Sequence, residues 1–147
     1  MKCTNVDGIP QVVVSFKALI RKGNSYLFIK RTPNAGYSPS LWDLPGGKLG
    51  IGEDINKTLE REVKEETNLV VKPEKQNFYI EKHKSDLKKH KGLMYMKLDF
   101  KSRLIKGDLK LNEEHTDFKW LPLKQALKLD LTPEVRRSLL SLTRVKH

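Results

Sequence analysis

The sequence contains a single cysteine, Cys3, so no internal disulfide can form and the fold does not depend on an oxidising compartment. It also lacks a long hydrophobic run. The longest apolar-leaning segment, residues 12–20, is interrupted by Ser15 and Lys17 and is far shorter than the roughly 20 residues that span a bilayer. Residues 1–10 carry no apolar stretch typical of a signal peptide. We therefore expect a cytoplasmic protein with no membrane partner.

Acidic residues are in the minority: 18 Asp and Glu stand against 29 Lys and Arg, which gives a formal net charge of +11. A basic surface attracts anions and raises their local concentration, so phosphates and nucleic acids are the obvious ligands, although such surfaces also serve solubility. The length of 147 residues predicts one compact domain over residues 1–147. Charge alone does not choose between these interpretations, so the positions of particular residues must decide.

Apolar periodicity and turn residues predict strands on either side of one central helix. Residues 11–20 and 25–30 are strand-like, and the turn residues between them predict a hairpin. Residues 54–67 lack Pro and Gly and carry Ile55, Leu59 and Val63 on one stripe, which predicts a helix. Further expected elements are extended runs at 77–80 and 93–100 around a solvated loop at 81–92, a strand at 117–121, a short helix after Pro122, and a final helix that begins at Thr132-Pro133-Glu134 and carries Val135, Leu139, Leu140 and Leu142 on its apolar side. This order predicts an α/β fold in which helices cover a mixed sheet.

The predicted central helix carries an unusual concentration of glutamates in its C-terminal half. Glu62 and Glu66 lie beside the apolar stripe, and Glu65 stands between them in the sequence. Like charges at this spacing repel one another, a carboxylate near an apolar layer loses hydration, and the helix dipole disfavours negative charge at this end. A hard divalent cation such as Mg²⁺, which is usually shared between carboxylates and phosphates, would offset these costs. The alternative is an exposed charged face that is balanced by Arg61 and neighbouring lysines.

Two features upstream of the helix favour the metal interpretation. In Pro45-Gly46-Gly47, the absence of side chains on the glycines lets the bare backbone approach an ion or a phosphate. Glu53 stands just before the helix, where an acidic residue could also simply complement the helix dipole. Together with the helix glutamates, these residues form a pattern that is more specific than any one of them.

That pattern resembles the Nudix box, a motif of 23 residues that here runs from 47 to 69. The matching positions are Gly47, Glu53, Arg61, Glu62, Val63, Glu65, Glu66 and Leu69. The one departure is Asn68, where the family has glycine. This position is a helix C-cap that needs a left-handed backbone, and Asn is the next-best residue for that conformation, so we expect no loss of activity.

The resemblance implies a Nudix-type α/β/α sandwich with a mixed β-sheet, and a box that holds Mg²⁺, with Mn²⁺ as an alternative, over the diphosphate of the substrate. Glu62 and Glu66 would be the principal metal ligands, with Glu65 beside them and the Gly46 carbonyl as a backbone ligand. Their carboxylates would bind the ions that neutralise the transition state and activate water.

The resemblance also implies roles for residues around the metal. Arg61 would pair with Glu53 and orient the carboxylates. Arg31, at the end of the second predicted strand, matches a position that often contacts substrate phosphate in MutT-like members, although an ordinary strand-end charge is the alternative. The general base is either a box glutamate or an acidic residue before the last strand, where Glu113 and Glu114 stand.

Among functions, a MutT-like nucleoside triphosphate pyrophosphohydrolase comes first, because the chain is short. A hydrolase of a nucleoside-diphosphate-linked compound such as ADP-ribose comes second. A non-catalytic nucleotide- or RNA-binding module is the third alternative; it would use the 82–91 loop with Tyr79 and Tyr95, but the intact glutamates argue against it, so we do not expect a nucleic-acid partner. The sequence does not choose which aromatic residue stacks on a base among Phe16, Tyr37, Phe78 and Trp120, and it neither requires nor excludes a homodimer.

Overall fold

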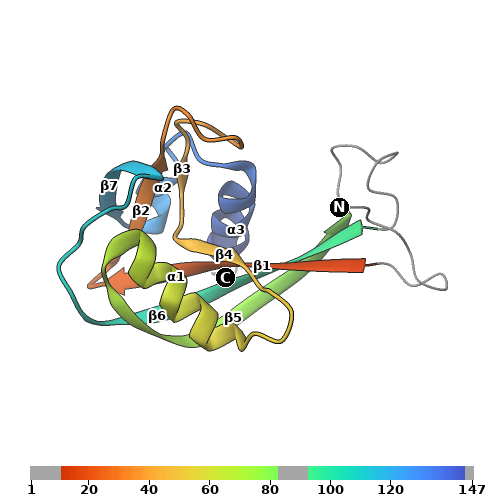
Figure 1. Ribbon diagram of the computed structural model, residues 1–147. Coiled ribbons are helices and arrows are strands. Elements are labelled where there is room, and N and C mark those ends of the chain that lie inside the picture. Colours follow the sequence, from red (N-terminus) through yellow and green to blue (C-terminus); the bar gives the residue numbers. More distant parts are fainter. Residues whose placement is uncertain (1–10, 83–92, 145–147) are drawn as a thin grey trace.

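The protein, seen here in a computed structural model, is described over residues 11–82 and 93–144 (Figure 1). Residues 1–10, 83–92 and 145–147 lie outside the described part, and so do Cys3 and most of the predicted 81–92 loop. The elements in chain order are β1 (Gln11–Lys22), β2 (Ser25–Arg31), β3 (Trp42–Asp43), β4 (Gly46–Lys48), α1 (Ile55–Thr67), β5 (Val70–Lys82), β6 (Leu93–Lys106), β7 (His115–Leu121), α2 (Leu123–Ala126) and α3 (Pro133–Arg144). A single domain over residues 1–147 stays a prediction. None of the helices in the described ranges has the length and apolar character of a membrane span.

The strands form one mixed sheet in the order β3-β2-β1-β6-β5, with β4 also paired to β1 and β7 to β2. The pairing of β1 with β6 is parallel, and the other strand pairs are antiparallel. The predicted hairpin is confirmed, but β1 and β2 pair only at its tip, at Arg21↔Tyr26 and Lys22↔Ser25. Beyond the tip β2 follows β7, and β4 takes the freed edge of β1 opposite Ser15 to Lys17. Gly46 therefore lies where β2, with its partner β7, separates from β1, with its partner β4.

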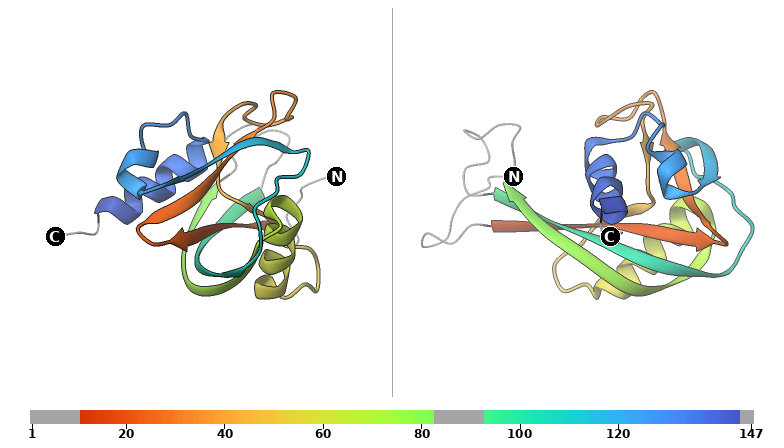
Figure 2. Two further views of the ribbon diagram at one scale, coloured as in Figure 1. Left: turned by 90° about the vertical axis from the view of Figure 1, so that its left-hand side faces the viewer. Right: turned by 180° about the vertical axis from the view of Figure 1, so that it is seen from behind.

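Side-chain alternation along β1 and β2 builds a separate core on each face of the sheet. The core beneath α1 consists of Phe16, Ala18, Ile20, Leu27, Ile29, Leu59, Val63, Leu69, Val71 and Phe100. The core beneath α2 and α3 consists of Leu19, Phe28, Trp42, Leu44, Ala126, Leu131, Val135 and Leu139. Figure 2 shows α1 on one side of the sheet and α3 on the other, so the expected α/β/α arrangement is confirmed.

Both long helices begin with a side-chain cap, of which the one at Thr132 was predicted from the sequence. The Asp54 side chain accepts a hydrogen bond from the Lys57 N–H at 3.0 Å, and Thr132 Oγ1 accepts one from the Val135 N–H at 3.4 Å. Asn68 ends α1 in the left-handed conformation with φ of 64°. In α3, however, Leu140 is 36% exposed, so its expected place on the apolar side was wrong. The buried stripe of α3 follows Val135 and Leu139 instead.

Two strands are longer than predicted. The sequence prediction placed extended segments only at 77–80 and 93–100, whereas β5 begins at Val70 and β6 continues to Lys106. The pairing register of these strands shifts between Pro73 and Lys75. Proline has no N–H to donate to a neighbouring strand, so Pro73 indicated that no strand runs through this segment. The strand nevertheless continues across it because β6 supplies a long partner.

Candidate active site

The packing of α1 determines how far each glutamate is exposed. Leu59 and Val63 are fully buried against the sheet, which fixes the rotation of the helix about its axis. Glu66 is consequently only 8% exposed, whereas the side chains of Glu62 and Glu65 are 25% and 54% exposed. The three box glutamates therefore differ in solvent contact, and Glu66 is the innermost.

Glu66 is held by the backbone of Gly46. The Gly46 N–H donates a hydrogen bond of 2.9 Å to Glu66 Oε1, so the N–H of this residue faces the carboxylate. A Cβ at Gly46 would lie 2.0 Å from the Phe16 carbonyl oxygen, which no side chain permits. Burial raises the pKa of Glu66 to about 8, although the Gly46 hydrogen bond and the nearby Lys17 oppose this rise. The carboxyl is thus largely protonated at neutral pH until a cation favours its ionised form.

Glu62 lies directly against the second glycine. A Cβ at Gly47 would lie 3.2 Å from Glu62 Cγ and 3.3 Å from Glu62 Cδ, so glycine leaves room for this side chain. The pKa of Glu62 is raised, first by burial and then by the negative charge of Glu65. Glu62 and Glu66 therefore both resist ionisation, as expected for carboxylates that are gathered to share a cation.

Arg61 connects the outer acids of the site. One terminal nitrogen lies 3.0 Å from Glu53 Oε2 and 3.6 Å from Glu62 Oε1, and the other lies 3.7 Å from Glu65 Oε1. Glu53 is fixed at its other oxygen by the Gly50 N–H at 2.5 Å. The structure thus brings together the Arg61–Glu53 pair that the sequence predicts. Glu65 lies on the Arg61 side of this group, and its role as a metal ligand stays a prediction.

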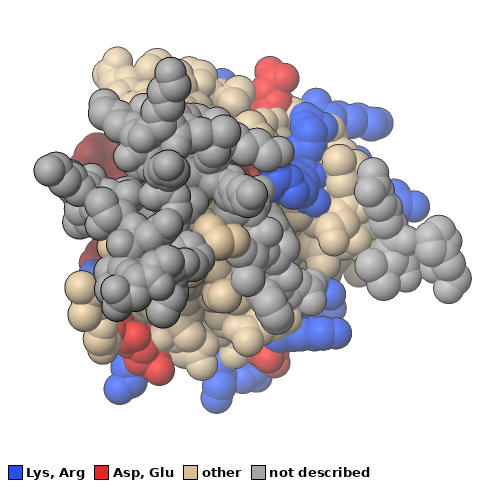
Figure 3. Space-filling model, turned by 90° about the vertical axis from the view of Figure 1, so that its right-hand side faces the viewer, with Lys and Arg blue, Asp and Glu red and all other residues tan. Residues whose placement is uncertain are grey.

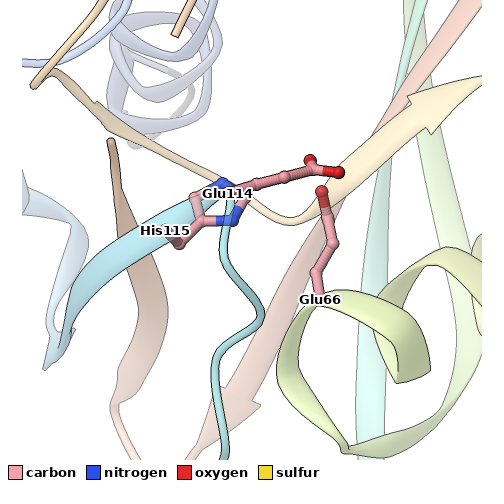
Figure 4. Close-up of side chains that lie close together, drawn as sticks. All are labelled: Glu66, Glu114 and His115. Atoms are coloured by element: carbon pink, nitrogen blue, oxygen red, sulfur yellow. The ribbon is translucent and has the colours of Figure 1, made fainter. Parts of the chain in front are cut away.

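The loop before β7 adds two residues to Glu66. Ligand atoms of Glu66, Glu114 and His115 lie within 4.8 Å of one another, and Figure 4 shows the two carboxylates pointing toward each other. The loop is attached to the end of α1, because the Asn112 N–H donates to the Glu66 carbonyl oxygen at 3.3 Å. Glu114 is exposed, whereas His115 is 6% exposed. Burial lowers the pKa of His115 to about 4, so its ring is neutral at pH 7 and keeps a lone pair for a ligand.

Arg31 is engaged by protein groups. Its Nε donates to the Tyr37 carbonyl oxygen at 2.8 Å, and its NH1 donates to Asp43 Oδ2 at 3.2 Å. Asp43 is buried and also accepts a hydrogen bond from Lys17 Nζ at 3.1 Å. Arg31 therefore joins the 32–40 loop to the sheet, and its predicted contact with substrate phosphate stays a prediction.

The residues present fit a divalent cation. Glu66 and Glu114 supply carboxylate oxygens, which suit Mg²⁺ and Mn²⁺, and His115 supplies a neutral imidazole in the same cluster. Glu62 is not part of this cluster, but its carboxylate lies beside Gly47 on the same helix as Glu66. The strongest structural sign is Glu66, a buried carboxyl with a raised pKa that a positive charge would relieve. No observation bears on the Gly46 carbonyl as a ligand, and that expectation stays a prediction.

Sequence reasoning missed three residues of the site: Lys17, Asp43 and His115. A lysine inside an otherwise apolar strand was a usable signal for Lys17, because such a charge needs a partner. Asp43 and His115 carry no comparable local signal, since each becomes buried only through strands far away in the sequence. Both candidate bases before β7 are exposed, but only Glu114 joins the cluster with Glu66.

The aromatic residues that were considered for base stacking have different surroundings. Phe16 is 1% exposed in the core beneath α1, and Trp120 packs partly buried against the same core. Tyr37 is 54% exposed. The side chains of Phe78 and Tyr79 lie outside the described part of the structure. Of these residues, Phe16 is therefore excluded as a stacking partner in this conformation.

Residues 11–142 match the family model described as NUDIX domain. The chain is 27% identical over 128 residues to nucleoside triphosphatase NudI of Escherichia coli O81 (strain ED1a), an alignment that covers 82% of this chain and 89% of that protein. Among solved structures, the MutT protein of Methanosarcina mazei Go1 superposes with a TM-score of 0.75 at 26% identity, covering 92% of this chain and 95% of that one. An ADP-ribose pyrophosphatase of Streptococcus suis 89-1591 superposes with a TM-score of 0.62 at 22% identity, covering 92% and 94%. At that identity the second structure supports the fold alone.

Proposed function

This chain belongs to the Nudix family and is a hydrolase of phosphoanhydride bonds, and we propose that it splits nucleoside triphosphates into a nucleoside monophosphate and pyrophosphate. The observation that carries the proposal is the buried Glu66 carboxyl, which faces the Gly46 N–H on one side and Glu114 and His115 on the other. A cation bound here would favour the ionised form of Glu66 and would bring the phosphates of the substrate to the same carboxylates.

We propose Glu62 and Glu66 as the residues that hold Mg²⁺, with Mn²⁺ as the alternative ion. An ion held by these two carboxylates would supply positive charge to the pyrophosphate oxygens and would make a bound water more acidic. Arg61 keeps Glu53, Glu62 and Glu65 in place, so these carboxylates do not have to reorganise when the substrate arrives.

Glu114 is our choice for the general base. It lies next to Glu66 yet is exposed, so it can accept a proton from the attacking water and pass it to solvent. Lys17 adds positive charge between Asp43 and Glu66 and favours phosphate binding on this side of the site. Each of these assignments uses a residue that the fold brings to Gly46 from a different element.

The choice of nucleoside triphosphates over other phosphoanhydrides rests on two relatives. One of them is called a nucleoside triphosphatase, and the other a MutT protein; both align over most of their length. We also propose that the enzyme acts in the cytoplasm, in keeping with its single cysteine. A homodimer stays an open alternative, and no nucleic-acid partner is expected.

A substrate panel tests the proposal. The protein is incubated with canonical nucleoside triphosphates, the matching diphosphates and ADP-ribose, with Mg²⁺, with Mn²⁺ and with EDTA, and the products are separated by anion exchange. We expect metal-dependent release of pyrophosphate and monophosphate from triphosphates. Release of inorganic phosphate from triphosphates would contradict the cleavage position, cleavage of ADP-ribose alone would support the second candidate, and absence of any turnover would leave only a binding module.

A further inference from the structure

Three lysines gather on the α3 face of the sheet, beside the candidate metal site. The three are Lys17, Lys48 and Lys97. Lys48 on β4 and Lys97 on β6 are both register partners of Ser15 on β1, so Lys48, Ser15 and Lys97 form one row across adjacent strands, here called the Lys48–Lys97 row. The next row two residues along β1 contains Gly46 and Lys17. Two residues of a strand span about 6.6 Å. The Lys48–Lys97 row therefore lies about that far from the glycine that holds Glu66.

The side chains of this row point to the same face. The ammonium of Lys97 lies 4.7 Å from the ring centroid of Tyr95, and that of Lys48 lies 6.0 Å from the same ring. Alternation along β6 places Tyr95, Lys97 and Asp99 on one side, and Asp99 forms a hydrogen bond with Ser138 of α3. The row is thus on the face that α3 covers only in part.

Neither Lys48 nor Lys97 has a carboxylate oxygen of a described side chain within ion-pair distance. Of the neighbouring acids, Asp43 is bound by Lys17 and Arg31, and Glu134 accepts a hydrogen bond from the Tyr37 hydroxyl. Asp99 is hydrogen-bonded to Ser138, and its charge interacts with both Lys17 and Lys97. Burial lowers the pKa of Lys97, and the charges of Lys17 and Lys48 lower it further, against the effect of Glu134. Like charges held together in this way favour an anion.

We propose that Lys48 and Lys97 bind the terminal phosphate of a nucleoside triphosphate whose other two phosphates lie at the Glu62–Glu66 site. This inference rests on the proposed function. A phosphate fits better than a nucleobase, because lysine ammoniums bind phosphate as point charges and two of them already lie over the Tyr95 ring. The row would select triphosphates over diphosphates, and after cleavage it would hold the pyrophosphate product.

The test compares tri- and diphosphate ligands in matched variants. Lys97→Met and Lys48→Met remove the charge and keep the length of the side chain, and Lys101→Met makes the same change on the same face of β6, four residues farther along. Binding of the non-hydrolysable α,β-methylene analogues of a nucleoside triphosphate and of its diphosphate is measured calorimetrically with Mg²⁺. Because a hydrogen bond to a charged group contributes roughly 1.5–3 kcal/mol, we expect at least about tenfold weaker triphosphate binding in each row variant. Diphosphate binding should change less than about twofold, and Lys101→Met should bind both ligands as the parent does.

The outcomes separate the inference from the proposed function. Equal weakening for both analogues would overturn the inference by placing the lysines against the nucleoside or the shared diphosphate, and unchanged binding would overturn it outright. Because binding is measured without turnover, failure of the parent to release pyrophosphate would count against the proposed function instead. Circular dichroism checks folding, and should the half-buried Lys97 position not tolerate Met, the exposed Lys48→Met variant carries the same comparison.

Discussion

At the scale of single residues, Glu66 offers the sharpest test of the metal site. Burial raises its pKa above that of an exposed glutamate to about 8, so the folded protein loses stability as pH rises from 4.5 toward 8 without a cation. Glutamine mimics the neutral carboxyl and keeps an oxygen for the Gly46 N–H. We predict that Glu66→Gln folds at least as stably as the parent at pH 7.5 in EDTA, yet loses roughly 100- to 1000-fold in kcat/KM.

The measurements for Glu66→Gln are steady-state kinetics and thermal melting with and without Mg²⁺. Millimolar Mg²⁺ should raise the melting temperature of the parent and leave that of the variant nearly unchanged. Glu60→Gln is the matched control, because Glu60 lies on the exposed side of the same helix. Undiminished hydrolysis by Glu66→Gln would remove this residue from the mechanism.

His115 makes a different prediction, about acid stability. Because burial lowers its pKa from 6.5 to about 4, the folded state prefers the neutral ring. The stability that this preference contributes is complete above pH 6.5 and is lost as pH falls toward 4, by up to about 3 kcal/mol at 1.36 kcal/mol per pH unit. In urea unfolding with EDTA, the parent should therefore lose more stability than His115→Gln between pH 7 and pH 4. Parallel loss in both proteins would mean that the ring is already charged in the native state.

At the scale of elements, the end of α1 depends on the conformation of Asn68 rather than on glycine. Its φ of 64° costs an ordinary side chain roughly 1–2 kcal/mol, and its Nδ2 also donates to the Asp108 carbonyl oxygen at 2.9 Å. We predict that Asn68→Ala lowers the free energy of unfolding by at least about 1 kcal/mol, whereas Asn68→Gly changes it by less. Urea titration measures the difference, and equal effects of Ala and Gly would show that the hydrogen bond dominates. Because the glutamates precede this cap, kcat should change little in either variant.

Elements whose ends are marked by turn or cap residues could be predicted from the local sequence. The hairpin at Gly23-Asn24, the Thr132 cap and the Asn68 end could all be predicted because turn and cap residues act within a few positions. The short strands β3 and β4 could not, since two or three residues have no periodicity and become strands only by pairing with β2 and β1. The parallel pairing of β1 with β6 could not be predicted from the sequence either, because it joins segments about half a chain apart.

At the scale of the whole molecule, the same limit explains which part of the site could be predicted. Glu53, Arg61, Glu62, Glu65 and Glu66 lie within one segment, so their spacing was enough to bring them together. Glu114 could be named as a candidate from its place before the last strand, but its position beside Glu66 needs the loop that is attached to the end of α1. His115 and Asp43 lie in the site only because β7 and β3 both pair with β2. Contacts between segments that are distant in the sequence cannot be predicted from the spacing of residues.

The net charge of +11 also acts at this scale, through attraction of polyanionic substrates. In Figure 3, Lys and Arg side chains gather along the right-hand side of one face, where Asp and Glu are few. Salt screens such attraction, because the Debye length falls from about 10 Å at ~0.1 M to about 3 Å at ~1 M ionic strength. We predict that kcat/KM for a triphosphate falls about tenfold between ~0.05 M and ~0.5 M NaCl at fixed free Mg²⁺, mainly through KM. Rates measured over this range, beside urea midpoints to confirm that folding is unaffected, give the answer. A kcat/KM that stays constant while the protein remains folded would mean that substrate capture depends on the metal site and its adjoining lysines, and not on the charge of the molecule as a whole.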